Sequence, residues 1–408
     1  MAGLRLLDKL RKLWETFPSK AVLSKTDRRQ MQHEADVHRL FLATSYNHFI
    51  KTACEKEPEE ICDLASRISF QDQQKQVQEY IHVQIQAICQ AMDDMLIWDE
   101  QMEKPKTAST PMKQNARRSG LSFAVGATAN RTYPDMTAVA ATRSMKNVEL
   151  SSALKERIGY TLELKPSQVC HEKGGQGLYL SGKAGIGAVV SFYPGVIYSP
   201  SNYRYIPGYP RVDAGNPYLI SRYDGIVIDA QPWGTGGETR EFWNGIFDRS
   251  TTEFSRSSQR NKADVLWQTL SKPKQNMSLT KGAVVERRNP LALGHFANHP
   301  DKGMQPNVMI CPYNFPLSDT RMRTYIPNLL FGSEEEVIME RYGSFWLKST
   351  SADDINVSVP PAIRTLVLVA TRPICDEEIF LNYRLSNPKR RPDWYHPVDE
   401  EEDRRRWS

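Results

Sequence analysis

Hydrophobic side chains recur at helical spacings through the first hundred residues. The clearest example covers residues 81–95, where the apolar positions are Ile81, Ile85, Ile88, Met92 and Met95. Steps of three and four residues place these side chains on one face of an α-helix. A further helix is expected over residues 29–56, with a buried side made of Leu40, Phe41, Phe49 and Ile50. The pattern therefore predicts a helical N-terminal region over residues 1–100, in the form of a small bundle.

Residues 1–17 carry another amphipathic stripe, in which Arg and Lys separate Leu, Trp and Phe. The stripe fits a helix of the same bundle, but basic amphipathic helices also bind membrane surfaces or target organelles. Asp8 and Glu15 disfavour targeting, because transit peptides are poor in acidic residues. No stretch reaches the roughly 20 apolar residues that span a bilayer. We expect an intracellular protein of the nucleus or cytoplasm, with membrane contact or organelle targeting through residues 1–17 as disfavoured alternatives.

From about residue 157 the pattern changes to short runs of Val, Ile and Tyr between Gly, Pro and Asn, which is typical of β-strands. The expected strands lie at residues 177–180, 188–193, 225–228, 308–310 and 366–370. Long polar intervals at 231–289 and 312–361 predict insertions, with candidate helices at 261–270 and 334–342. The strands do not alternate with regular helices. A doubly wound sheet is therefore disfavoured, and an α+β fold is expected.

Composition predicts a linker and argues against nucleic-acid binding, metal sites and disulfides. Residues 101–150 are rich in Ser, Thr, Ala and Pro and carry far more basic than acidic side chains, which predicts a flexible basic linker. The whole chain has a net charge of only +5, so direct nucleic-acid binding is not expected. Its six cysteines are scattered and form no CxxC pair. That spacing argues against a zinc cluster, against another metal site and against a disulfide framework.

Four short segments combine residue types that carry chemistry, at residues 174–180, 191–198, 293–308 and 374–383. Glycines in the first segment let a backbone approach a ligand closely. Asn298 and His299 in the third can both donate and accept hydrogen bonds. Each segment alone also has a structural explanation: a tight hairpin, a core strand, a satisfied histidine, or a tyrosine packed after a buried strand. The residues by themselves leave both explanations open.

Taken in order, the four segments resemble the motifs of the SET-domain protein lysine methyltransferases. Residues 175–177 are similar to the opening G-x-G of that family, and residues 193–195 to its Y-x-G. Residues 294–307 are similar to its N-H-S-x-x-P-N element, and residues 377–383 to its E-E-L-x-x-D-Y ending. The resemblance covers about residues 160–400. It implies a β-rich SET domain over residues 157–385 with a C-terminal pseudoknot, preceded by the helical region and followed by a flank at 386–408 that covers the cofactor.

The resemblance also implies a cofactor, a reaction and roles for particular residues. The cofactor would be S-adenosyl-L-methionine, and the partner would be a protein that presents a lysine, histone or non-histone. Tyr383 would be the catalytic tyrosine, and Tyr193 a second active-site tyrosine that orients the lysine amine. The implied cofactor contacts are Gly175, Gln176, Gly177, His295, Asn298, His299, Tyr383 and Trp394, the last by stacking on the adenine.

This sequence departs from the family pattern at four positions, Pro300, Asn382, Val196 and Ile310. Ile310 stands where many members place an aromatic residue that limits how many methyl groups are added, so the number transferred is left open. None of these positions removes Tyr383 or Asn298. Deprotonating a lysine of pKa 10.4 costs roughly 4 kcal/mol at pH 7.4, and a desolvated channel lined by tyrosines reduces that cost. The alternative function is a catalytically weak or inactive SET fold that acts as a protein-interaction module.

Overall fold

The computed structural model describes most of the helical region and the strand-rich part of the chain. The described residues are 25–51, 58–96, 145–171, 174–212, 216–233, 242–243, 246–248, 284–286, 289–316, 319–323, 325–331, 339–342, 345–348, 362–385 and 390–407. The predicted stripe over residues 1–17, the candidate helix at 261–270 and most of the linker lie outside them. Within the described ranges, no helix is long and apolar enough to cross a membrane.

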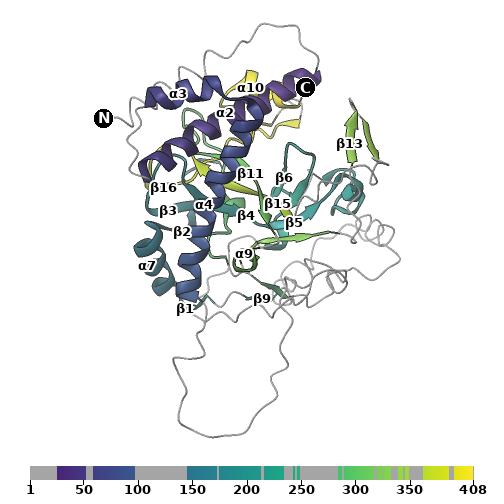
Figure 1. The fold of residues 1–408 in the computed structure, drawn as a ribbon. Helices are drawn as coiled ribbons and strands as arrows, with labels where there is room; N and C mark the ends of the chain where they lie inside the picture. The colour runs from purple at the N-terminus through teal and green to yellow at the C-terminus, as the bar shows by residue number, and fades with distance from the viewer. Residues whose placement is uncertain are drawn as a thin grey trace, which may run out of the picture.

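Three helices form the N-terminal region (Figure 1): α2 (Lys25–Lys51), α3 (Pro58–Arg67) and α4 (Phe70–Leu96). All five apolar residues predicted for the buried face of α4 are buried. On α2, Leu40 and Phe41 are buried as expected, but Ile50 is 61% exposed. The prediction for Ile50 was wrong because nine positions at 100° each bring it to the face opposite Phe41. Helix α2 is described as far as Lys51, and residues 52–56 of the predicted helix lie outside the described residues.

Regular structure resumes inside the range that composition predicts as a linker. Strand β1 (Met145–Lys146) leads directly into helix α7 (Asn147–Ile158), which ends at Gly159 in a left-handed conformation. Leu150 and Leu154 are buried one turn apart on this helix. The linker prediction was therefore wrong for residues 145–150, because a single pair of leucines does not outweigh the surrounding polar composition.

Three larger sheets, two antiparallel and one mixed, form most of the described β structure, and three two-stranded pairs accompany them. The first has the order β16 (Ile374–Glu378), β3 (Gln176–Ala184) and β2 (Tyr160–Pro166). The second has the order β11 (Val308–Pro316), β15 (Ala362–Ala370) and β4 (Val189–Tyr193). The third has the order β12 (Asn328–Leu330), β5 (Gly195–Tyr198), β7 (Val227–Asp229) and β6 (Leu219–Ser221). Together with the helices they give the α+β fold predicted from the sequence.

The predicted insertions contain strands and short helices. These elements are β8 (Phe242–Trp243), β9 (Ile246–Asp248), β10 (Val284–Glu286), α9 (Thr320–Arg323), β13 (Met339–Tyr342) and β14 (Phe345–Lys348). The helix predicted at 334–342 was wrong for its last four residues, because β13 pairs with β14 in an antiparallel hairpin that local propensity does not reveal. The insertion predicted from residue 312 begins too early. Strand β11 runs on to Pro316, and it tolerates proline because it lies at the edge of its sheet.

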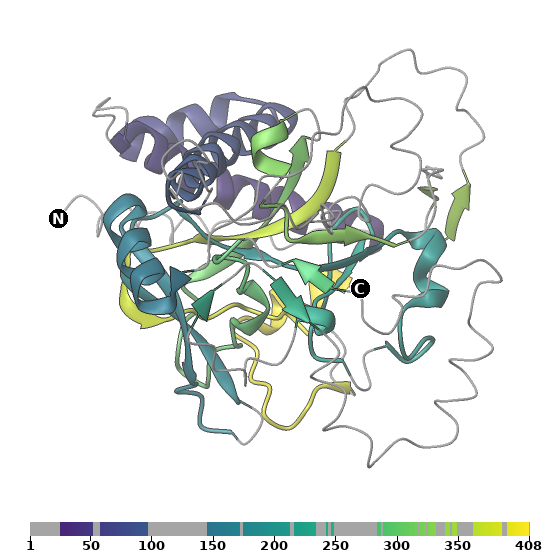
Figure 2. The ribbon, with the colours of Figure 1, turned by 90° about the horizontal axis from the view of Figure 1, so that it is seen from below.

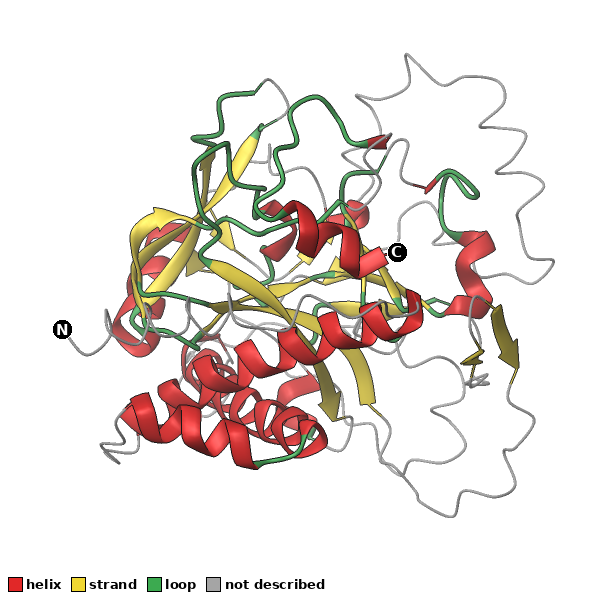
Figure 3. Ribbon diagram, turned by 90° about the horizontal axis from the view of Figure 1, so that it is seen from above, coloured by secondary structure: helices red, strands yellow, loops and turns green. Residues whose placement is uncertain are grey.

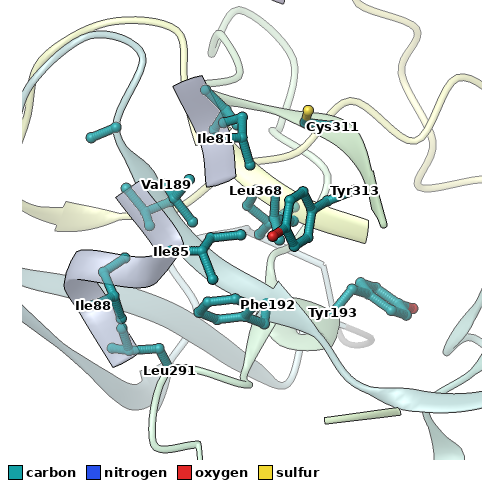
Figure 4. Packing of buried hydrophobic residues seen from close by; sticks show 14 of the residues in the cluster. Ile81, Ile85, Ile88, Val189, Phe192, Tyr193, Leu291, Cys311, Tyr313 and Leu368 are labelled. Atoms are coloured by element: carbon teal, nitrogen blue, oxygen red, sulfur yellow. The ribbon is translucent and has the colours of Figure 1, made fainter. Parts of the chain in front are cut away.

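The N-terminal helices share one hydrophobic core with the sheets. Figure 2 shows these helices gathered on one side of the strands. Figure 4 shows Ile81, Ile85 and Ile88 on the side of α4 that faces Val189 and Phe192. Tyr193, the next residue of β4, points away from this group in the same view. The helices thus cover one face of the β4 sheet and leave Tyr193 to the opposite side.

The segment that follows β16 lies against the loop 298–308 and contacts the loop at both of its ends. Phe380 forms a parallel bridge with Asn298, and Leu381 forms one with Val308. The Leu381 N–H donates to the Asn298 carbonyl at 2.8 Å, and the Asn307 N–H donates to the Phe380 carbonyl at 3.1 Å. A segment held on both sides by one loop is the pseudoknot arrangement that the sequence resemblance implies. Tyr383 lies two residues after Leu381, directly beyond the pseudoknot.

Candidate active site

Tyr383 is held at both its backbone and its hydroxyl. Its N–H donates to His299 Nδ1 at 3.2 Å, and its hydroxyl donates to the Ala297 carbonyl at 3.1 Å. Burial raises the pKa of the Tyr383 phenol well above its ordinary value, and the neighbouring Tyr218 raises it further. The phenol is therefore neutral at any physiological pH, and its oxygen has a fixed position.

Tyr193 approaches the same place from the end of β4. Its hydroxyl donates to the Tyr218 carbonyl at 2.8 Å, and the side chain is only 5% exposed. Burial is the main cause that raises the pKa of Tyr193, followed by the nearby Tyr383, Asp229 and Tyr218. The three tyrosines are thus electrostatic neighbours in the folded chain. Tyr218 was missed by sequence reasoning, because it precedes a short strand in a segment without a recognisable motif.

His295 lies beside two of these tyrosines. Its ring centroid is 6.4 Å from that of Tyr193 and 5.7 Å from that of Tyr218, each in an edge-to-face arrangement. It belongs to the short 3-10 turn Gly294–Phe296, all of which is buried. Gly294 is required there, because a Cβ at this position would lie 2.9 Å from the Phe192 carbonyl oxygen. The turn therefore packs closely on β4 and places His295 next to the tyrosines.

His299 is buried and bonded through both ring nitrogens. Nδ1 accepts the N–H of Tyr383, so Nε2 must carry the proton that it donates to the His396 carbonyl at 2.7 Å. The ring also stacks on Tyr395, with centroids 4.4 Å apart. Burial lowers the pKa of His299 below its ordinary value, although the hydrogen bond to His396 opposes this shift. The site therefore holds a neutral histidine in one tautomer.

Asn298 ties the glycine-rich segment to the pseudoknot. Its side-chain amide donates to the carbonyls of Gly174 at 3.0 Å and Gln176 at 3.2 Å. Gly175, between them, has a φ of +54°, a conformation that side chains other than glycine rarely adopt. The Asn298 side chain therefore holds the loop that contains Gly175 and Gln176.

A buried carboxylate explains the second glycine of this segment. A Cβ on Gly177 would lie 2.1 Å from Glu378 Oε1. Glu378 is 1% exposed and accepts hydrogen bonds from Ser167 Oγ at 2.6 Å and the Gln168 N–H at 2.8 Å. Sequence reasoning identified Glu378 only as part of the final motif. In the structure it anchors the loop that precedes β3.

The C-terminal flank closes the site beside Tyr383. Trp394 meets Tyr383 edge to face with ring centroids 6.4 Å apart, and it stacks on His171 at 4.8 Å. His171 is a neighbour that the sequence did not indicate. The predicted rings of His295 and Tyr193 lie in contact, and so do those of His299, Tyr383 and Trp394. Gln176 takes part through its backbone carbonyl. Among the described residues, no group of three or more His, Cys, Asp and Glu side chains is placed to hold a metal ion.

This chain has relatives among known proteins. No protein-family model matches it. It is similar to SET domain-containing protein 9 of Homo sapiens and to the protein of the same name in Pongo abelii, each 24% identical over 233 residues, or 56% of this chain. The match covers 60% of the human protein and 66% of the Pongo abelii protein, so this chain spans less than two thirds of either relative. SET-domain proteins generally methylate lysine with S-adenosylmethionine as the cofactor. The similarity to these relatives and the α+β fold support the assignment of this chain to the SET-domain family.

Proposed function

We propose that this chain is an S-adenosylmethionine-dependent protein-lysine N-methyltransferase of the SET type. The observation that carries the proposal is the gathering of three buried or partly buried tyrosines. The Tyr193 hydroxyl donates to the Tyr218 carbonyl, and the nearby Tyr383 packs against Trp394. The substrate class is an intracellular protein with an accessible lysine. The two relatives support the family to which this activity belongs.

The residues at the site fit the proposed cofactor. The indole of Trp394 offers an aromatic surface suited to stacking on a base. The carbonyl of Ala297 and the hydroxyl of Tyr383 place oxygen atoms together, and such oxygens suit the polarised C–H groups of a methyl sulfonium. His299 and Asn298 hold these groups in place through the bonds described above.

S-adenosylmethionine supplies an electrophilic methyl group in this reaction. The chain's own contribution is to present the lysine nitrogen as a neutral, correctly aimed nucleophile. A lysine amine that binds among buried, uncharged tyrosines loses solvation, and this favours the neutral amine over the ammonium. The pKa of the bound lysine is therefore lowered. The fixed hydroxyls of Tyr193 and Tyr383 then restrict where that nitrogen lies. Alignment of this kind removes much of the entropic cost of the reaction.

The first prediction concerns the hydroxyl of Tyr383. Tyr383→Phe should reduce methyl transfer about 100-fold or more, since a fixed polar contact to the reacting groups is lost. It should leave binding of S-adenosylhomocysteine nearly unchanged, because the ring still packs against Trp394. Transfer is measured with radiolabelled S-adenosylmethionine on core histones and on a library of lysine peptides, and binding is measured by calorimetry.

Tyr209→Phe is the matched control. Tyr209 is 49% exposed, so its substitution should change neither methyl transfer nor cofactor binding. Equal transfer by wild type and Tyr383→Phe would contradict the proposed role of this tyrosine. Cofactor binding by the wild type without transfer to any probe would favour the protein-interaction module.

A further inference from the structure

The residue after the candidate catalytic tyrosine turns toward the N-terminal helix α2. Arg384 has a φ of +51°, a left-handed conformation that a residue with a side chain rarely adopts unless its surroundings hold it. Its guanidinium is 12% exposed and contacts two carboxylates from different ends of the chain. Nη1 lies 2.8 Å from Asp36 Oδ2, and Nη2 lies 3.2 Å from Glu402 Oε1. Asp36 belongs to α2, outside the segments that resemble the catalytic domain.

Glu402 fastens the C-terminal helix α10 (Glu400–Trp407) to the same N-terminal helix. Its carboxylate also accepts from Gln32 Nε2 at 2.9 Å and pairs with Arg39, both on α2. Figures 1 and 3 show α10 beside α2. Burial raises the pKa of Glu402, but Arg384 and Arg39 outweigh burial and lower it overall. The carboxylate is therefore ionised, and the two helices are joined by opposite charges.

The same helix α10 holds the flank that closes the site. Asp403 accepts a hydrogen bond from the Tyr395 hydroxyl at 2.5 Å and lies 3.5 Å from Arg391 Nη2. Tyr395 stacks on His299, which in turn accepts the N–H of Tyr383. A continuous series of contacts therefore runs from α2 through α10 and the flank to the candidate catalytic tyrosine.

We propose that helix α2 supports the cofactor site. Asp36 and Glu402 act as positioning residues, which hold Arg384 and the flank that carries Trp394 in the conformation that binds the cofactor. This inference rests on the proposed function, since it concerns binding at the same site. Neither Asp36 nor Glu402 touches the reacting groups. Their effect is transmitted through Arg384 on one side and through Asp403 and Tyr395 on the other.

The test is calorimetric titration of the full chain with S-adenosylhomocysteine. Asp36→Asn keeps the shape of the side chain and removes its charge, which leaves Arg384 only partly neutralised in a buried position. We expect affinity to fall about 10-fold, within the range usual for coupling between sites. Glu34→Gln is the matched control. It removes one carboxylate from the same helix, where Glu34 accepts a hydrogen bond from Gln30 at 2.9 Å, and affinity should stay within about twofold.

A second measurement separates positioning from general loss of stability. If Asp36 acts through the flank, Asp36→Asn should weaken binding much less once Trp394→Ala has already removed the flank's contact. Hydrogen exchange in the ligand-free chain should also accelerate at residues 390–407 in Asp36→Asn and not in Glu34→Gln. Should Asp36→Asn fail to fold, Glu402→Gln tests the same contacts from α10.

The outcomes distinguish this inference from the function on which it rests. Wild-type protein that is folded but binds no S-adenosylhomocysteine would overturn the proposed function. Wild-type binding that Asp36→Asn and Glu402→Gln leave unchanged would overturn the role of α2 while the function stands. Equal weakening by Asp36→Asn with and without Trp394 would also overturn it, because the effect would then not pass through the flank.

Discussion

His299 links the candidate catalytic tyrosine to the C-terminal flank through both of its ring nitrogens. One nitrogen accepts from Tyr383 and the other donates to His396, so the ring can serve both contacts only while it is neutral. Protonation would place a second N–H against the Tyr383 N–H and break that contact. A single proton therefore changes how the flank and the tyrosine are held.

The pH dependence follows from the lowered pKa of His299. A histidine has a pKa near 6.5 when unfolded, so just below that pH the unfolded chain binds more protons than the folded one. The contribution of neutral His299 to the free energy of unfolding is fully present above pH 6.5. It is lost as the pH falls below that value, by at most about 1.4 kcal/mol per pH unit. Urea unfolding from pH 8 to pH 5 should show this loss. His299→Asn should show a flatter profile, while the contribution of His38 remains in both proteins; parallel profiles would contradict the assignment.

At the residue scale, the sequence predicted the groups whose chemistry is recognisable from local motifs. Tyr383, Asn298 and His299 are of this kind, because each stands inside one of the four segments that resemble SET-domain motifs. Tyr218 and His171 could not be predicted, since they meet the site only through folding and carry no local signal. The role of the Asn298 side chain in tying the glycine loop likewise depends on a contact between segments more than a hundred residues apart.

Helix α4 is the element on which the sheet around the site depends. Its apolar face packs on β4, the strand that ends at Tyr193 (Figure 4). Polar contacts fix the register, since the Gln84 amide donates to the Gly187 carbonyl at 3.0 Å and accepts the Val189 N–H at 3.0 Å. The helix thus sets the position of β4 as well as covering it.

Truncating one core residue of α4 tests this dependence. Ile85 is fully buried, so Ile85→Ala should lower the free energy of unfolding by about 2–5 kcal/mol, through lost burial and the cavity that remains. Val83 on the same helix is 55% exposed, and Val83→Ala should change stability by no more than about 0.5 kcal/mol. Both values are read from urea unfolding at one pH. A loss for Ile85→Ala as small as that for Val83→Ala would show that α4 is not part of the core.

The type and buried face of an element were predictable where periodicity was long, and its extent was mispredicted where a partner strand decides it. The face of α4 repeats over four turns and was identified correctly. Strand β11 extends through Pro312 because β15 pairs with it along nine residues, a partner that the local sequence does not reveal. Strand β13 replaces the last four residues of a predicted helix for the same reason. Local patterns therefore gave the types of the long elements better than the extents of the short ones.

On the scale of the whole molecule, both termini of the described chain support the site from outside the sheets. The N-terminal helices contribute to the central core through α4 and to the flank through α2. A tight approach at Gly187 joins the two parts, because a Cβ there would lie 2.0 Å from the Ala43 carbonyl oxygen of α2. The α+β class could be predicted from the pattern of strands and helices, and the pseudoknot from the resemblance to SET domains. The docking of the helices could not, since it depends on matching surfaces between distant segments.

Calorimetric titration of the full chain with S-adenosylhomocysteine is the decisive measurement of whether this cluster binds S-adenosylmethionine. The account predicts micromolar binding by the wild type. It predicts weakening of about 5- to 150-fold in Trp394→Ala, the range equivalent to stacking worth about 1–3 kcal/mol. No binding by a wild-type protein shown to be folded by circular dichroism would contradict the account.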